Sequence, residues 1–167
     1  MTISLDLNLR RRIWSDAAAA PVLRSFAAGV DVLLGSPDEL AVVTGLSADD
    51  DPADLARAVL SLGPAVAIAK LGAEGALAVD RDAPEMPVTR SGLPLPVVVD
   101  PVGAGDAFCA GFIAARLDGA ELVVALETAN ACGASAALGD QTGLPDRAEL
   151  AAILRSGGDG GGSDTIR

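Results

Sequence analysis

The sequence contains no histidine and no tyrosine, and aromatic residues make up only 2% of its 167 positions. The absence of histidine excludes imidazole as a general base and as a metal ligand. A general base that acts at neutral pH is therefore a carboxylate, a cysteine or the single lysine, Lys70. Because single-stranded nucleic acids stack their bases on aromatic rings, the scarcity of these rings argues against such a ligand.

Cysteines and long apolar runs are also scarce. Cys109 and Cys132 form no CxxC pair and have Ala-rich neighbours, so we interpret them as small buried apolar residues in a reducing cytoplasm. No apolar run approaches the ~20 residues of a membrane-spanning helix. The N-terminal basic cluster follows the first apolar residues, which is the reverse of a secretory signal. These features predict a cytoplasmic protein.

Positive charge is in short supply. Twelve cations stand against 23 carboxylates, which gives a formal net charge of −11. Long-range electrostatics therefore oppose binding to nucleic acid or to an anionic membrane. An anionic ligand would need a local device such as a helix N-terminus, a set of backbone amides or a metal ion.

What is present is the pattern of a layered α/β domain, with half of the residues hydrophobic. Strands are predicted at 2–8, 30–34, 65–71, 76–80 and 97–100, with an edge strand at 87–90. Helices are predicted at 16–28, 37–43, 51–62, 106–117, 121–138 and 148–155. We expect one folded part at 1–155, with a largely parallel sheet, and a flexible Gly-rich tail at 156–167. A sheet of so few strands would leave an apolar edge bare.

The segment VVVDPVGAGDAF at 97–108 carries the chemistry. A predicted buried strand ends at Asp100, a loop containing Gly103 and Gly105 follows, and a helix is predicted to begin at Asp106. Glycines let successive amides point into one concavity, and the helix N-terminus adds partial positive charge, so this loop predicts an anion site. Asp106 would then take a proton from an attacking hydroxyl, or alternatively serve as an ordinary helix N-cap.

DPVGAGDAF resembles the signature of ribokinase-like (PfkB) carbohydrate kinases, D-T-x-G-A-G-D. Four further segments, at 5–14, 33–45, 67–79 and 127–150, resemble family stretches in the same order. The first resembles a D-x-N-x-R-x-x-L-W pattern, with Ile13 in the place of Leu, and the GD-x-x-GLP ending of the last is similar to that of 2-keto-3-deoxygluconate kinases. The resemblance implies a three-layer αβα fold and ATP-dependent phosphorylation of a sugar hydroxyl.

The same resemblance assigns roles near the phosphates. Asp106 would be the catalytic base, and the amides of Gly103, Ala104 and Gly105 would hold the transferring phosphoryl group. Glu39 matches a motif glutamate that organises Mg²⁺. Asp100 and the carbonyl of Val102 match positions that help to hold a monovalent cation, K⁺.

Two further groups of residues follow from the resemblance. Those expected along the nucleotide are Gly72, Glu74, Gly75, Asn130 and Gly133. Those expected at the substrate are Asp6, Asn8 and Arg10, and the guanidinium of Arg10 suits a sugar-acid carboxylate. The structural alternatives are Asx turns for Asp6 and Asn8 and a helix-capping role for Asn130. Lys70 is interpreted either as a nucleotide contact or as a snorkelling cation at the end of a strand.

The chain departs from the family pattern in three places. Pro101 and Val102 replace two threonines, and Ser36 replaces a motif asparagine. The chain also resembles only the C-terminal half of a family member, which implies that the N-terminal strands and the small β lid are absent.

The expected function is phosphorylation of 2-keto-3-deoxygluconate or a related keto sugar acid, with fructose or another ketose as the alternative substrate. A truncated, catalytically incomplete nucleotide-binding fragment is the second interpretation. An interaction protein that dimerises through its sheet edge is the third. The expected partners are a sugar and either a second copy of the chain or a separate N-terminal half.

Overall fold

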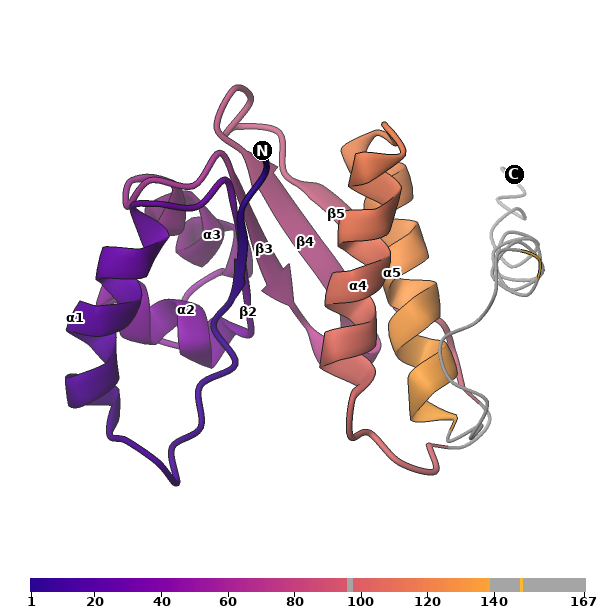
Figure 1. Cartoon of the computed structure of the whole chain (residues 1–167), viewed down its shortest axis with the longest axis horizontal. Coiled ribbons are helices and arrows are strands. Elements are labelled where there is room, and N and C mark those ends of the chain that lie inside the picture. Colours follow the sequence, from indigo (N-terminus) through magenta and orange to yellow (C-terminus); the bar gives the residue numbers. More distant parts are fainter. Residues whose placement is uncertain (96–97, 139–147, 149–167) are drawn as a thin grey trace, which may run out of the picture. The chain divides into compact units, whose positions relative to one another are not determined.

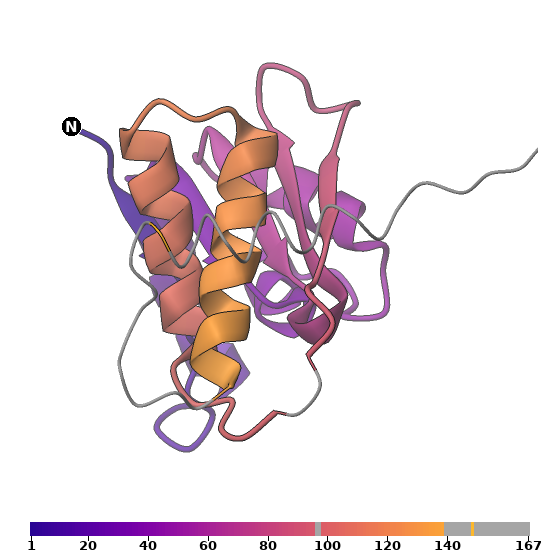
Figure 2. The same cartoon turned by 90° about the vertical axis from the view of Figure 1, so that its right-hand side faces the viewer.

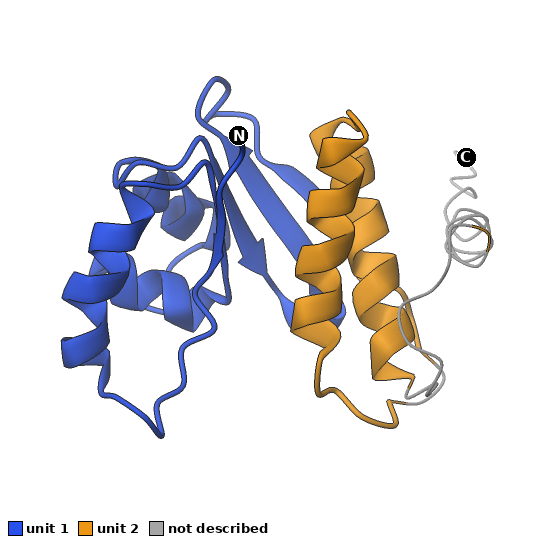
Figure 3. Cartoon of the chain, viewed as in Figure 1, with its two compact units in different colours: residues 1–91 blue, residues 92–167 orange. Residues whose placement is uncertain are grey.

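The structure, a computed structural model, describes residues 1–95, 98–138 and 148. The chain divides into two compact units, Met1–Ser91 and Gly92–Arg167 (Figure 3). Of the helix predicted at 148–155, only residue 148 is described, and it is helical. The tail predicted at 156–167 lies outside the described residues.

The first unit is built on a five-stranded sheet in which the strands follow one another in sequence order (Figure 1). The strands are β1 (Ser4–Asp6), β2 (Val32–Gly35), β3 (Val66–Lys70), β4 (Gly75–Asp80) and β5 (Val88–Ser91). β1, β2 and β3 are parallel, and β4 is antiparallel to both of its neighbours. Four of the five strands therefore run in one direction, which confirms the prediction of a mostly parallel sheet.

Three helices lie on one face of this sheet: α1 (Asp16–Ala27), α2 (Pro37–Thr44) and α3 (Pro52–Leu60) (Figure 1). Their starts are fixed by local chemistry, because the side chains of Ser15 and Asp51 accept N–H groups of the first turns of α1 and α3. Both α2 and α3 also begin with a proline, which needs no N–H partner there. The core between helices and sheet contains Leu33, Leu40, Val43, Leu55 and Val59, all with no exposed surface.

The second unit contains two antiparallel helices, α4 (Ala104–Leu117) and α5 (Leu122–Ala137), which lie side by side in both views (Figures 1 and 2). Gly111 permits their close approach. A Cβ atom at Gly111 would lie 2.7 Å from Sγ of Cys132 and 3.2 Å from Cα of Ala129. Across the described parts of both units, no helix has the combination of length and apolar character that a membrane crossing requires.

The prediction of a strand at 97–100 is wrong for the residues of this range that the structure describes. Val98, Val99 and Asp100 form no strand, and the two valines are 56% and 64% exposed. The amides of Val99 and Asp100 donate to the carbonyl of Ala137 instead, at the C-terminal end of α5. An apolar run becomes a strand only where a neighbouring strand accepts its hydrogen bonds, and here the end of a helix accepts them.

Candidate functional site

The loop that precedes α4 is folded by its own residues. Asp100 accepts the amide of Val102 on Oδ1 at 2.9 Å, and the carbonyl of Pro101 accepts the amide of Ala104 at 3.2 Å. Gly103 adopts φ 85°, a left-handed conformation that side chains disfavour. A Cβ atom built on Gly103 would meet nothing within 4 Å, so the constraint on this glycine is its backbone conformation.

The N-terminus of α4 presents free donors. Within the described residues, the amides of Gly103, Gly105 and Asp106 have no acceptor, whereas the amide of Ala104 is engaged in the turn. The first amides of a helix are unpaired and lie at the positive end of its dipole. This loop therefore has the donors of an anion site.

α4 begins at Ala104, two residues before its predicted start at Asp106, and Gly103 occupies the N-cap. Asp106 is therefore the third residue of the helix. The interpretation of Asp106 as the N-cap is therefore wrong. Its side chain is exposed and makes no hydrogen bond to any described residue. An exposed carboxylate in the same first turn as these free amides has the chemistry to accept a proton from a bound hydroxyl.

In the first unit, the predicted substrate residues fall on the chain that leaves β1. Leu7 and Leu9 are buried and alternate with the exposed Asn8 and Arg10. Asn8 adopts φ 38°, and the amide of Leu7 donates to the carbonyl of Leu34 at 2.9 Å. This alternation turns two polar side chains outward and fixes them to the core through their apolar neighbours.

Asp6 and Lys70 form an ion pair that the sequence did not predict. Nζ of Lys70 lies 2.5 Å from Oδ1 of Asp6, and the two side chains are 17% and 18% exposed. Lys70 therefore does not snorkel into solvent, which corrects the interpretation as a free strand-end cation. No local signal could have found a pair that lies 64 residues apart in the sequence.

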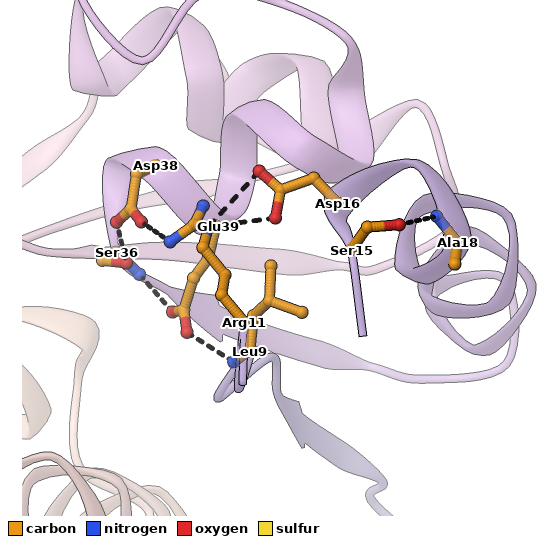
Figure 4. Close-up of polar contacts among 8 residues, drawn as sticks. All are labelled: Leu9, Arg11, Ser15, Asp16, Ala18, Ser36, Asp38 and Glu39. Atoms are coloured by element: carbon orange, nitrogen blue, oxygen red, sulfur yellow. Dashed lines mark hydrogen bonds and ion pairs between the residues drawn. The ribbon is translucent and has the colours of Figure 1, made fainter. Parts of the chain in front are cut away.

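Glu39 uses both carboxylate oxygens to accept backbone amides (Figure 4). Ser36 donates to Oε2 at 2.8 Å, and Leu9 donates to Oε1 at 2.7 Å. The bond to Ser36 is half of a capping box at the start of α2. The bond to Leu9 is long-range and ties the chain after β1 to α2, so the sequence could not reveal it.

Arg11 bridges two helix starts beside Glu39 (Figure 4). Its guanidinium lies 2.9 Å from Asp16 and 2.5 Å from Asp38. These hydrogen bonds raise the pKa of Arg11, and the bond to Asp38 has a larger effect than the bond to Asp16. Burial favours the protonated form of Asp38, but hydrogen bonds from Ser36 and Arg11 outweigh it and lower the pKa of this carboxyl.

The residues predicted along the nucleotide lie in both units. Gly72 and Glu74 are exposed in a 3₁₀ turn, and Gly75 is the buried first residue of β4. Asn130 and Gly133 lie on α5, where Asn130 is buried. A Cβ atom at Gly133 would lie 3.1 Å from the carbonyl oxygen of Ala104, so this glycine also has a packing role in the helix pair.

The described geometry thus assembles two groups of predicted site residues. Asp6, Asn8, Arg10 and Glu39 gather around the end of β1 and the start of α2 in the first unit. Asp100, Gly103, Ala104, Gly105 and Asp106 form the loop and first turn of α4 in the second unit. No group of three histidine, cysteine or acidic side chains suited to a metal occurs within the described residues.

Comparison with known proteins identifies the class to which this fold and these loops belong. The chain matches the pfkB family carbohydrate kinase profile over residues 2–148. It therefore belongs to the PfkB carbohydrate kinase family, and its fold is the ribokinase-like α/β fold. This confirms the resemblance carried by the DPVGAGDAF motif.

Individual members of the family are similar to this chain over most of its length. The chain is 34% identical to 2-dehydro-3-deoxygluconokinase of Thermoproteus tenax over 157 residues, which cover 92% of this chain and 46% of that protein. It is 35% identical to the enzyme of the same name from Bacillus subtilis, with the same two coverages. A crystal structure of fructokinase from Vibrio cholerae O395, with fructose, ADP and calcium ion bound, is 30% identical with a TM-score of 0.75. That match covers 90% of this chain and 50% of the fructokinase. The chain spans about half the length of the relatives it matches.

Proposed function

We propose that this chain carries the phosphoryl-transfer machinery of an ATP-dependent kinase acting on 2-keto-3-deoxygluconate or a related keto sugar acid. The observation that carries the proposal is the start of α4, where free amides of Gly103, Gly105 and Asp106 stand beside the unengaged carboxylate of Asp106. Phosphoryl transfer requires positioning and charge stabilisation more than covalent chemistry. A base and an amide cradle supply these two needs.

In the proposed reaction, Asp106 accepts the proton of the sugar hydroxyl while the hydroxyl oxygen attacks the γ-phosphorus of ATP. The bond between that phosphorus and the β,γ-bridging oxygen breaks, and ADP leaves. The amides of the α4 N-terminus hold the equatorial oxygens of the transferring group, where negative charge is spread in the transition state. The two relatives named 2-dehydro-3-deoxygluconokinase support a keto sugar acid as the acceptor.

Arg10 is the residue proposed to recognise the acceptor. Its side chain is exposed, and no described residue offers it a carboxylate, whereas the adjacent Arg11 is committed to Asp16 and Asp38. A guanidinium binds a carboxylate through paired hydrogen bonds, which a neutral ketose cannot accept in the same way. Asn8, exposed on the same stretch, is proposed to bind a sugar hydroxyl.

The proposed cofactors are ATP, Mg²⁺ and K⁺. Magnesium prefers oxygen ligands and keeps several of its waters, with nucleotide phosphates supplying much of the rest. Glu39 fits this chemistry, because each of its oxygens accepts one N–H group and keeps a further lone pair. Asp100 and the carbonyl of Val102 are the oxygen ligands proposed for K⁺. Bound cations would neutralise part of the negative charge on the nucleotide phosphates.

The alternative is a nucleotide-binding chain that does not turn over alone. Two observations favour it. The chain spans about half the length of its relatives. In addition, β1 and β5 each pair with a single neighbour, so both edges of the sheet lack a further strand partner among the described residues. An incomplete sheet and acceptor pocket would leave the phosphate loop intact and the sugar poorly held.

ADP release by the purified chain with Mg-ATP and 2-keto-3-deoxygluconate tests the proposal. We expect sugar-dependent turnover that falls by roughly 10²–10⁴-fold in Asp106→Asn with nucleotide affinity retained. Glu121→Gln, at the exposed N-cap of α5, is the matched control and should leave turnover unchanged. Normal turnover by Asp106→Asn would refute the role of Asp106. Nucleotide binding without turnover in the parent chain would support the incomplete fragment.

A further inference from the structure

We propose that Glu39 is a positioning residue for the sugar-acid site, because its carboxylate holds the segment Leu7–Arg10 in its binding conformation. This inference rests on the proposed function, in which Arg10 and Asn8 contact the acceptor. It assigns to Glu39 a role toward the sugar that is separate from its proposed role toward Mg²⁺.

The geometry of Glu39 is that of a clamp between two segments. One oxygen accepts the amide of Ser36 at 2.8 Å, where β2 passes into α2. The other accepts the amide of Leu9 at 2.7 Å, thirty residues away in the sequence. Hydrogen bonds to an ionised acceptor are shorter and stronger than neutral ones. Figure 4 shows the carboxylate between these two amides.

The segment that Glu39 holds needs such a clamp. Asn8 has φ 38°, in the left-handed region that asparagine adopts more readily than most residues but that still turns the chain sharply out of β1. The bond to Leu9 is the hydrogen bond that immediately follows this turn. It therefore fixes the direction in which the chain leaves Asn8, and with it the starting point of the Arg10 side chain.

Packing around the clamp leaves little space for adjustment. A Cβ atom at Gly35 would lie 2.9 Å from Cδ1 of Leu7, 3.1 Å from Cδ2 of Leu40 and 3.5 Å from Cβ of Glu39. The absence of a side chain at Gly35 thus lets the Leu7 segment rest directly against the start of α2. Arg11, paired with Asp16 and Asp38, secures the other end of the same segment.

The chemistry requires a carboxylate at position 39. Both partners are N–H donors, and an ionised carboxylate presents an acceptor to each. A glutamine of the same shape has one oxygen and one NH₂ group, so it can satisfy Ser36 or Leu9 but not both. Glu39→Gln therefore removes one bond of the clamp with minimal change in volume.

The test combines a structural readout with ligand affinity. In ¹H–¹⁵N spectra of the full chain, Glu39→Gln should shift the Leu9 amide and speed its hydrogen exchange by about tenfold or more. Affinity for 2-keto-3-deoxygluconate, measured in the absence of Mg²⁺ and nucleotide, should fall about tenfold. Asp54→Asn, which removes an exposed first-turn carboxylate from α3, is the control and should change none of these values.

A double-mutant cycle identifies the route of the effect. If Glu39 acts through the Arg10 segment, Glu39→Gln should cost little further sugar affinity in an Arg10→Ala background. Should Glu39→Gln fail to fold, Glu39→Asp, which keeps the charge but is too short to reach both amides, takes its place in every measurement. Equal losses of affinity in the two backgrounds would overturn the inference.

The remaining outcomes separate this inference from the proposed function. Unchanged sugar affinity in the variant, beside a parent chain that binds the sugar acid, overturns the positioning role alone. A changed Mg²⁺ requirement with unchanged sugar affinity also overturns it, because Glu39 then acts through the metal. A parent chain that binds no sugar acid overturns the proposed function, and the ligand assigned to this segment falls with it.

Discussion

Lys70, at the end of β3, donates a hydrogen bond to the carboxylate of Asp6, at the end of β1, with 2.5 Å between Nζ and Oδ1. The pair crosses over β2, which lies between these strands in the sheet. Parallel strands end at the same edge, where ligands of open α/β sheets bind. The ion pair therefore joins the edge of the sheet to the start of the segment that carries Asn8 and Arg10.

Removal of the Lys70 ammonium should destabilise the first unit. Lys70→Met removes the charged hydrogen bond that Lys70 donates to the mostly buried Asp6, so we expect a loss of about 1.5–3 kcal/mol in the free energy of unfolding. Asp54→Asn breaks an exposed pair with Arg57 and should cost less than about 1 kcal/mol. Urea unfolding compares the two variants, and equal losses would show that the Asp6–Lys70 pair contributes no more than a surface pair.

Gly111 provides a test of helix packing, because replacing it with alanine should change stability in the direction opposite to that given by intrinsic helix propensity. Gly→Ala normally favours a helix by about 1 kcal/mol. At Gly111 the added methyl would meet the Cys132 side chain at 2.7 Å and backbone of Ala129 at 3.2 Å, so Gly111→Ala should destabilise the chain by about 1–3 kcal/mol. Ala110→Gly, at the exposed neighbouring position, calibrates the propensity. Thermal unfolding reports both variants, and a stabilised Gly111→Ala would contradict the packing described here.

The Asp38 carboxyl predicts a pH dependence of stability. Its pKa is lowered in the folded state, because the bonds from Ser36 and Arg11 outweigh burial. A lowered pKa contributes stability that is fully present above the unfolded value of about 3.9 and is lost as the pH falls through the folded value. Asp38→Asn should therefore weaken the chain at pH 6 and remove part of its acid sensitivity below pH ~4.

Urea unfolding of Asp38→Asn and the parent chain between pH 2 and pH 6 checks this expectation. The difference in stability between the two proteins should shrink as the pH falls. A difference that is constant over this range would mean that Asp38 titrates alike in the folded and unfolded states.

Local sequence signals predicted much of the fold. The five strands of the first unit and its three helices appear where the patterns of apolar residues, prolines and capping side chains place them. These signals depend on neighbours a few residues apart, which is why they can be read from the sequence. The loop before α4 was also located, because its glycines and acids are contiguous, although α4 begins at Ala104 rather than at Asp106.

The errors arose where distant groups decide the outcome. Residues 98–100 have the composition of a buried strand, but their amides bond to the end of α5. Lys70 has the position of an exposed cation, but Asp6 holds it at the sheet edge. In both cases the partner lies more than thirty residues away in the sequence, beyond the reach of any local pattern.

The sequence by itself determined the family of this chain, the order of its elements and the position of the Gly-rich loop before α4, because each is encoded in short contiguous motifs. Only the tertiary structure decided which polar groups are committed. Arg11 is held by two carboxylates, Glu39 is shared between two backbone amides, and Arg10 has no carboxylate partner within the described residues. Hydrogen bonds over a few ångströms select among chemically similar side chains, and only the folded chain sets those distances.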